Sequence, residues 1–316
     1  MTDTLELPRS GFSPREVSMA YAAIIVTLSI VSILPILFSV SESSISPNAT
    51  VFNRFWIATL VLGLWNGRSL LKKQALQNSP PIKQLPDIHN LLLLLILAII
   101  FVGFQLLWAC SLTKTSVANS EVLHSLTPLF TTLIGWSLLG QKFDRVFLTG
   151  IAIALAGSIG LAANDFSIAV EKLGGDGLAL LSAMFWAGYL LVLEKLQTQL
   201  SIMTIITGNC LLGTLFLLPI LLVTRDEPFP HSFGGWLIAI ILGLTVILIQ
   251  GLIAYSLKRL SSGLVAAILL LNPILTAILA WIIFSETLNL LNWLAFAIVL
   301  LGIYLTTLSK YGIKTQ

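Results

Sequence analysis

Charged residues are scarce in this chain. Only 10% of its 316 residues are Asp, Glu, Lys or Arg, whereas soluble domains carry about 25%. The hydrophobic fraction is 57% and the mean hydropathy is +0.97. A water-soluble core could not hide this much apolar surface, so we expect lipid to be the solvent. The net charge of +3 is too small to indicate a nucleic-acid partner, and none is expected.

The motifs of common enzymes are missing as well. The three histidines, His89, His124 and His231, are scattered, which excludes the HExxH motif of a metalloprotease. No GxSxG elbow, phosphate-binding P-loop or DDxxD-like cluster occurs in the sequence. The two cysteines, Cys110 and Cys210, form no CxxC pair. The sequence therefore indicates no cofactor and no metal, and its first 18 residues lack the apolar core of a cleavable signal peptide.

What the chain has is a series of long apolar runs. Continuous runs suit helices, whereas the strands of a membrane barrel alternate every second residue. A bilayer core of about 30 Å needs roughly 17–25 helical residues. We therefore predict an all-α, polytopic membrane protein with ten transmembrane helices, at 19–40, 49–66, 89–110, 118–139, 146–163, 176–194, 202–223, 235–257, 264–285 and 290–309.

Positive charges give these windows an orientation. With the N-terminus in the cytoplasm, only Lys114, Lys172 and Arg225 of the 17 Lys and Arg residues fall outside. Arg54 falls within a span, and the other 13 fall inside. Cytoplasmic loops carry an excess of Lys and Arg, so both termini are predicted to be cytoplasmic, in an inner or plasma membrane.

The two halves of the chain resemble each other at a spacing of 145 residues. Without a gap, 101–160 and 246–305 share 14 identities in 60 positions. The informative pairs are Gln105/Gln250, Ser111/Ser256, Pro128/Pro273, Thr131/Thr276, Trp136/Trp281 and Gly157/Gly302. The alternative is chance similarity between apolar sequences. Five spans per repeat is an odd number, so the second copy must be inverted relative to the first. We predict an N-terminal cytoplasmic segment at 1–18, repeats at 19–163 and 164–309, and a cytoplasmic tail at 310–316.

The sequence resembles the EamA-like members of the drug/metabolite transporter superfamily. The resemblance rests on 123-LHSLTPLFTTLIGWSLLGQKF-143 with 151-IAIALAGSIGL-161, and on 270-LLNPILTAILAWIIFSETL-288 with 298-IVLLGIYL-305. Ser46-Pro47 followed by Arg54 also matches the family's entry to its second helix. The chain departs from the family's pattern at three places. The region around Ser32 replaces the tryptophan common in the family's first helix, and Gly140-Gln141 replaces the usual Gly-Glu at the end of the fourth helix. Glu121 stands where the family has an apolar or small residue. The resemblance implies ten helices in two inverted halves, a central cavity, and export or exchange of small organic metabolites such as amino acids.

The fourth window carries an acid and a histidine on one helix face. At about 100° per residue, Glu121, His124, Thr127, Pro128 and Thr131 fall within an arc of roughly 120°. Ionisable groups inside a membrane are functional candidates, and this pair could bind an ammonium group or carry a proton. The alternative is that Glu121 lies in the outer interface, in water or paired with Lys114.

Further candidates come from the repeat and from aromatic side chains. Gln105 and Trp108 are three residues apart, and Gln250 repeats Gln105, so both amides could face a site or join helices by hydrogen bonds. Asn272 and Thr276 repeat the Thr127 and Thr131 positions, with the same two alternatives. Trp186 and Tyr189 could stack on a ligand or pack between helices. Arg54 is interpreted as structural, reaching outward or pairing with Glu42.

These observations predict a secondary transporter that works by alternating access. The expected partners are a small-molecule substrate and the lipid bilayer, with protons as a candidate coupling ion and a monomer or homodimer as the assembly. The chain is not expected to be an enzyme. The alternatives are a membrane-embedded enzyme or a non-transport assembly or receptor protein, neither of which needs an inverted repeat.

Overall fold

The computed structural model of the chain describes residues 13–42, 45–76, 87–115, 117–162, 173–272, 274–275, 278 and 290–309. Its helices are α1 Pro14–Val31, α2 Leu34–Glu42, α3 Pro47–Leu76, α4 Ile88–Lys114, α5 Val117–His124, α6 Thr127–Leu139, α7 Arg145–Ala162, α8 Leu173–Leu196, α9 Ile202–Thr224, α10 Phe233–Leu257, α11 Ser262–Leu269 and α13 Leu290–Leu308. Nine of the ten predicted windows overlap one helix or two consecutive helices, although α3 extends beyond its window of 49–66, and the first part of the 264–285 window overlaps α11. The second part of the 264–285 window lies mostly outside the described residues.

Serine side chains begin several of these helices. Ser201, Ser232 and Ser261 each accept a hydrogen bond from a backbone N–H in the first turn of α9, α10 or α11. Ser13 does the same for α1, and the backbone N–H of Ser13 donates a hydrogen bond to the side chain of Glu16. Such caps satisfy donors that a helix leaves free at its start. Short capped turns therefore separate the apolar segments.

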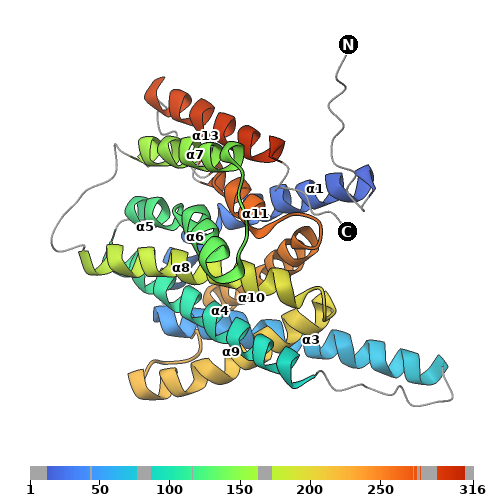
Figure 1. The fold of residues 1–316 in the computed structure, drawn as a ribbon. Coiled ribbons are helices and arrows are strands. Elements are labelled where there is room, and N and C mark those ends of the chain that lie inside the picture. The colour runs from blue at the N-terminus through green and yellow to red at the C-terminus, as the bar shows by residue number, and fades with distance from the viewer. Residues whose placement is uncertain are drawn as a thin grey trace, which may run out of the picture.

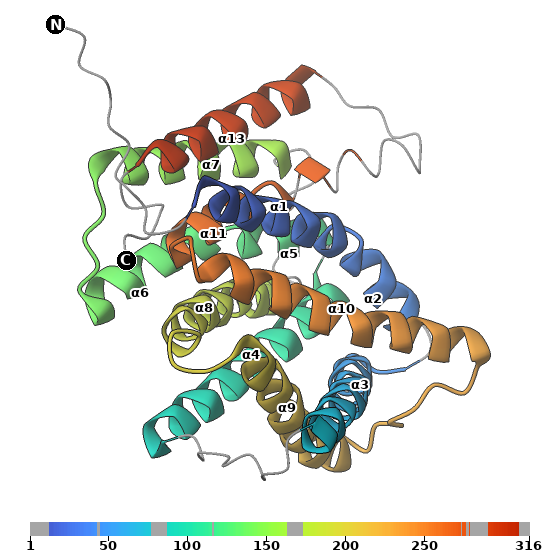
Figure 2. The ribbon, with the colours of Figure 1, turned by 90° about the vertical axis from the view of Figure 1, so that its right-hand side faces the viewer.

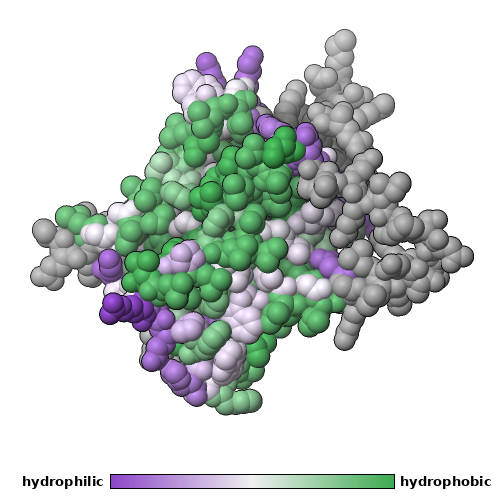
Figure 3. Space-filling model, turned by 90° about the horizontal axis from the view of Figure 1, so that it is seen from below, coloured by the Kyte–Doolittle hydropathy of each residue, from purple (hydrophilic) through white to green (hydrophobic). Residues whose placement is uncertain are grey.

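Among the residues that the structure describes, five helices are long and apolar enough to cross a membrane. They are α1, α4, α8, α9 and α10. Shorter apolar helices occupy Thr127–Leu139, Arg145–Gly160 and Trp293–Leu308. Large hydrophobic side chains such as Leu138, Leu222 and Trp65 are exposed on the molecular surface. In Figure 3 hydrophobic residues cover most of the visible face, and hydrophilic ones gather toward its edges. Soluble proteins seldom expose an apolar surface of this extent, so the fold is that of a multi-pass membrane protein.

Two windows predicted as continuous helices are broken in the structure. The first window is divided at Ser32-Ile33 into α1 and α2, and the fourth is divided at Ser125-Leu126 into α5 and α6. A proline follows each break, Pro35 in α2 and Pro128 in α6. Proline has no N–H, and its ring collides with the carbonyl four residues earlier, so the helix cannot run through it undisturbed. Our expectation of unbroken spans was wrong at these two points.

The helices pack as a bundle with a separate pair on one side. α7 and α13 lie side by side in both ribbon views (Figures 1 and 2). Glycines allow this close approach: a Cβ built on Gly302 would lie 2.3 Å from the backbone nitrogen of Ala154, and one on Gly157 would lie 2.8 Å from that of Val299. Elsewhere α4 runs along α8, and α3 lies against α9 and α10. The candidate site forms among these remaining helices.

Candidate functional site

A cavity of about 90 Å³ lies in the middle of the bundle. Its lining comes from α1 to α5, α8, α10, α11 and the residues just after α11: Val31, Leu34, Arg54, Phe101, Phe104, Gln105, Trp108, Glu121, His124, Trp186, Val246, Ile249, Gln250, Ile253, Leu269 and Asn272. A second cavity of about 40 Å³ also has Glu121, His124 and Trp186 in its lining. Both cavities thus combine apolar walls with a few polar groups, as small-molecule sites do.

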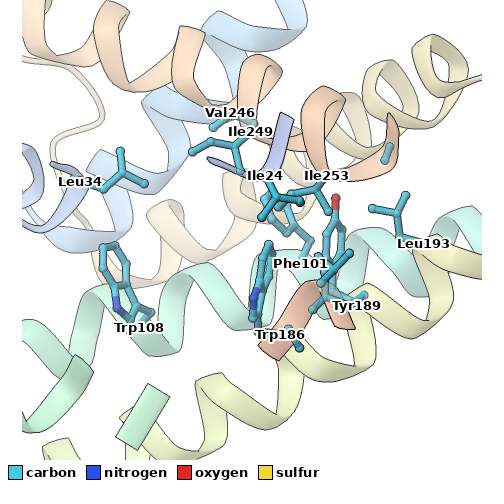
Figure 4. Close-up of a cluster of buried hydrophobic side chains, with 14 of the residues drawn as sticks. Ile24, Leu34, Phe101, Trp108, Trp186, Tyr189, Leu193, Val246, Ile249 and Ile253 are labelled. Carbon is cyan, nitrogen blue, oxygen red and sulfur yellow. The ribbon is translucent and has the colours of Figure 1, made fainter. Parts of the chain in front are cut away.

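Aromatic rings form one wall of the cavity. Phe104 of α4 stacks on His124 at 5.5 Å between ring centroids and lies 4.7 Å from the ring of Trp186 of α8. Trp186 in turn stacks on Tyr189 at 5.0 Å. In Figure 4 the rings of Phe101 and Trp186 lie on one side of this region, and aliphatic side chains of α10 lie opposite. The wall offers flat apolar faces to which a hydrocarbon or a cation could bind.

At one end of the cavity, the break in the fourth window positions a carboxylate. Glu121 lies on the short helix α5, and its Oε2 accepts a 2.9 Å hydrogen bond from the amide nitrogen of Asn272. Trp108 lines the same cavity as this carboxylate. The part of the chain that the structure describes contains no ion pair between Glu121 and Lys114. The acid therefore lies between the two halves of the chain, and pairing with Lys114 is wrong as an explanation of it.

The proline after the helix break also leaves a backbone carbonyl without its usual N–H donor. Pro128 cannot donate to the carbonyl of His124, and the hydroxyl of Thr127 donates to that oxygen instead, at 2.7 Å. The Nδ1 atom of His124 lies 3.3 Å from the hydroxyl of Ser182 on α8. This arrangement ties the end of α5 both to α6 and to the second half of the chain.

Arg54 of α3 is the cation of the cavity. Its side chain is only 2% exposed, so it does not reach outward as the sequence suggested. Its Nη1 donates to Oε1 of Gln105 at 3.0 Å, and its Nε donates to the carbonyl of Leu242 at 3.4 Å. The guanidinium carbon lies 4.8 Å from the ring centroid of Phe38. The side chain of Glu42, the partner that we considered, lies outside the described residues.

A matching pair lies in the second half. Asn209 of α9 donates to Oε1 of Gln250 on α10 at 2.7 Å, and the hydroxyl of Tyr189 donates to the same oxygen at 3.2 Å. Gln105 and Gln250 thus make equivalent contacts, each with a polar side chain from the preceding helix. Arginine occupies the partner position in the first half, and asparagine occupies it in the second.

The structure brings most of the predicted site residues together. Seven line the larger cavity (Gln105, Trp108, Glu121, His124, Trp186, Gln250 and Asn272), and Thr127 lines the smaller one. Thr131 lines neither cavity, since it is fully buried and donates to the carbonyl of Thr127. Tyr189 is also fully buried and lies behind Trp186. Thr276 lies outside the described residues.

Nine residues that line the larger cavity were not among the predicted site residues, and three of them are polar or aromatic: Arg54, Phe101 and Phe104. Arg54 was interpreted as structural, although an arginine inside an apolar window is itself a functional signal. Phe101 and Phe104 had no distinguishing signal among the 16 phenylalanines of the chain. Sequence spacing shows which residues share a helix face, but it does not show which face turns toward a cavity.

Known proteins support a transporter. The EamA-like transporter family matches the chain twice, over residues 18–163 and 173–308. An uncharacterized transporter of Archaeoglobus fulgidus is 24% identical over 282 residues, which is 87% of this chain and 93% of that protein. The uncharacterized inner membrane transporter YedA of Escherichia coli K12 is 25% identical over 194 residues, which is 61% of this chain and 62% of YedA.

A solved structure has the same fold. One crystal structure superposes with a TM-score of 0.74 at 18% sequence identity, covering 93% of this chain and 98% of the other. At that identity the likeness concerns the fold alone. The family match, in contrast, extends over nearly the whole chain in two segments, each of which contributes side chains to the central cavity. This chain belongs to the EamA-like transporter family and is a multi-pass membrane transporter.

Proposed function

We propose that the protein is a secondary transporter that exports or exchanges small organic metabolites, such as amino acids or related compounds, by alternating access. The observation that carries this proposal is the central cavity, because its lining combines residues of both halves of the chain. A site between two half-structures can open to either side as the halves rock against each other. The bound molecule crosses the membrane unchanged, so no catalytic group is required.

We further propose ten spans in two inverted halves, 19–163 and 164–309. Two structural correspondences support this arrangement. The break at Ser125-Leu126 reappears 145 residues later at Leu270-Leu271, where α11 ends. The Arg54–Gln105 pair of α3 and α4 corresponds to the Asn209–Gln250 pair of α9 and α10. Broken helices at a repeat interface are typical of transporter binding sites.

Contacts at the helix ends agree with the cytoplasmic termini that we propose from the charge bias. At the ends that we assign to the cytoplasm, the Oγ of Ser309 donates to Asp144 at 2.7 Å. At the opposite ends, the amide of Asn48 donates to Asp226 at 2.8 Å. Burial alone would raise the pKa of Asp226, but hydrogen bonds from Thr224, Asn48 and Ser46 together hold it below the ordinary value. Each contact joins ends that the charge bias places on the same side.

Three polar contacts lie near the helix ends that we assign to the cytoplasm. Nη2 of Arg259, just after α10, lies 3.4 Å from Oε1 of Glu16 on α1. The hydroxyl of Ser256 donates to the carbonyl of Ala20 at 2.9 Å, and Glu194 accepts from the backbone N–H of Ser262. The contacts of Arg259 and Ser256 connect the two halves, whereas Glu194 and Ser262 both lie in the second half. The two contacts between the halves can be broken without disrupting a helix, so they are suited to separate when the cavity opens inward.

Protons are the coupling ion that we propose, with Glu121 as the group that carries them. The carboxylate lies at the interface of the halves and accepts from Asn272 of the second half. Adding a proton would remove its charge and turn one of its oxygens into a donor. That change would alter the contact between the halves, which is what coupling requires.

The test is transport by the purified full-length protein in sealed vesicles. Radiolabelled small amino acids and related compounds are loaded, and exchange is followed with and without an imposed pH gradient. We expect a labelled compound to cross the membrane chemically unchanged, and a gradient to drive its accumulation. Recovery of a modified product without net movement would favour a membrane-embedded enzyme. Exchange that ignores the gradient would reject proton coupling but leave the transporter proposal standing.

A further inference from the structure

Arg54 is held in the cavity with part of its hydrogen-bonding capacity unused. A guanidinium has five N–H donors. The bonds to Gln105 and to the carbonyl of Leu242 use Nη1 and Nε, and neither acceptor is a carboxylate. Among the residues that the structure describes, Nη2 has no hydrogen-bond partner. Arg54 is a lining residue of the cavity, so a molecule in the cavity could use this donor group.

Within the described part of the chain, the charge of Arg54 has no ion-pair partner. The carboxylate in the cavity lining, Glu121, accepts a hydrogen bond from Asn272. A buried charge without a counter-ion is costly. The ring of Phe38, at 4.8 Å, offsets part of that cost on one face of the guanidinium. The remaining cost would be relieved by an anion in the cavity.

The second half makes a similar contact without a charge. Asn209 of α9 donates to Gln250, the repeat partner of Gln105, with a neutral amide. The contact between neighbouring helices therefore does not by itself account for a positive charge at Arg54.

We propose that Arg54 is the specificity-determining residue of the transport site and that it binds a single carboxylate group of the substrate. A guanidinium matches a carboxylate in planarity and donor spacing. The rest of the molecule would then lie against the rings of Phe104 and Trp186, which line the same cavity. The inference rests on the proposed function, because it assigns the substrate class of that same cavity.

The test compares a carboxylate with its neutral isostere. The probes are 3-phenylpropanoate and 3-phenylpropanamide, which share the ring and the chain length. Binding to purified full-length protein is followed by the fluorescence of its tryptophans, because Trp108 and Trp186 line the cavity. We expect the parent to bind the carboxylate at least about tenfold more tightly than the amide. No measurable binding at millimolar concentrations, or equal binding of both probes, would overturn the inference.

Variants then assign the preference to one residue. Arg54→Gln should bring the two probes within about twofold of each other, whereas Arg54→Lys should keep a weaker preference for the carboxylate. Asn209→Ala is the matched control, since it removes the equivalent bond in the second half and leaves Arg54 in place. A full preference in Arg54→Gln, or its loss in Asn209→Ala, would overturn the inference. If Arg54→Gln does not fold, the comparison of the parent with Arg54→Lys tests the inference. Loss of the carboxylate preference in Arg54→Lys would then contradict it.

The outcome is separable from that of the transport assay. Carboxylate-selective binding without exchange across vesicles would support the role of Arg54 and reject the transporter proposal. Exchange of both probes at equal rates would support transport and reject the role of Arg54.

Discussion

The role of each buried polar side chain in this protein depends on the group to which it is hydrogen-bonded. Lipid offers no hydrogen bonds, so each buried amide or charge must find a partner inside the bundle. Gln105 accepts from Arg54, Gln250 accepts from Asn209, and Glu121 accepts from Asn272. Two of these contacts stay within one half of the chain, and the one at Glu121 joins the halves. The last contact is therefore the one that a movement of the halves would change.

The first prediction concerns Glu121. Replacing it by Gln keeps the shape and the hydrogen bond to Asn272 but removes the titrating group. We expect Glu121→Gln to abolish accumulation driven by a pH gradient, while exchange without a gradient continues and the protein elutes as a folded species. Glu227→Gln serves as the control, because Glu227 is an exposed carboxylate paired with His231. Gradient-driven uptake within twofold of the parent at every pH would remove Glu121 from the coupling mechanism.

At the scale of helices, two devices shape the molecule. Prolines divide the first and fourth windows into shorter helices, and the second break places Glu121 and His124 of α5 beside the cavity. Glycines let α7 and α13 meet at backbone distance. Small residues at helix crossings stabilise membrane bundles, because lipid gives no hydrophobic drive for helices to associate.

The second prediction tests the glycine contact. A Cβ at Gly302 would lie 2.3 Å from the nitrogen of Ala154 and 2.6 Å from the carbonyl oxygen of Gly150. These are backbone atoms, so the helices must separate. We expect Gly302→Ala to lower the free energy of unfolding by about 1–3 kcal/mol. The measurement compares how much folded protein each variant loses after heating in detergent. Gly160→Ala, with nothing within 4 Å of the new Cβ, should be neutral or slightly stabilising. Equal effects of both variants would contradict close packing of α7 against α13.

At the scale of the whole molecule, the charge bias predicts a topology with which the helix-end contacts of Ser309 and Asn48 agree. In the topology that we propose, the loop between α8 and α9 is cytoplasmic and the loop between α9 and α10 lies outside. The single helix α9 separates these loops, so they lie on opposite sides of the membrane if α9 crosses it.

The third prediction tests that topology. In a chain with Cys110 and Cys210 replaced by alanine, single cysteines are placed at Gln199 and His231, which are both exposed. An impermeant thiol reagent added outside intact cells should label His231→Cys, and it should label Gln199→Cys only after the membrane is opened. Labelling of both sites from the same side would reject the ten-span arrangement with cytoplasmic termini.

The sequence by itself determined that this is a helical membrane protein and where most of its helices lie. Length and apolarity of a run are local properties, and a bilayer selects on them directly. The repeat also pointed to Gln105, Gln250 and Asn272, which all reach the cavity. Pro35 and Pro128 are visible in the sequence, but a proline alone does not show whether a membrane helix breaks, because kinking also depends on the neighbouring helices. We therefore predicted each of these windows as one helix.

The tertiary structure alone decided which side chains meet. Trp186 and Tyr189 share a helix face by spacing, yet only Trp186 reaches the cavity, because α10 covers the hydroxyl of Tyr189 through Gln250. Arg54 could reach outward on an isolated helix, and only the packing of α3 beside α4 gives it Gln105 as an acceptor. Such partnerships depend on how helices rotate and cross, and those quantities are set by all the contacts of the bundle together.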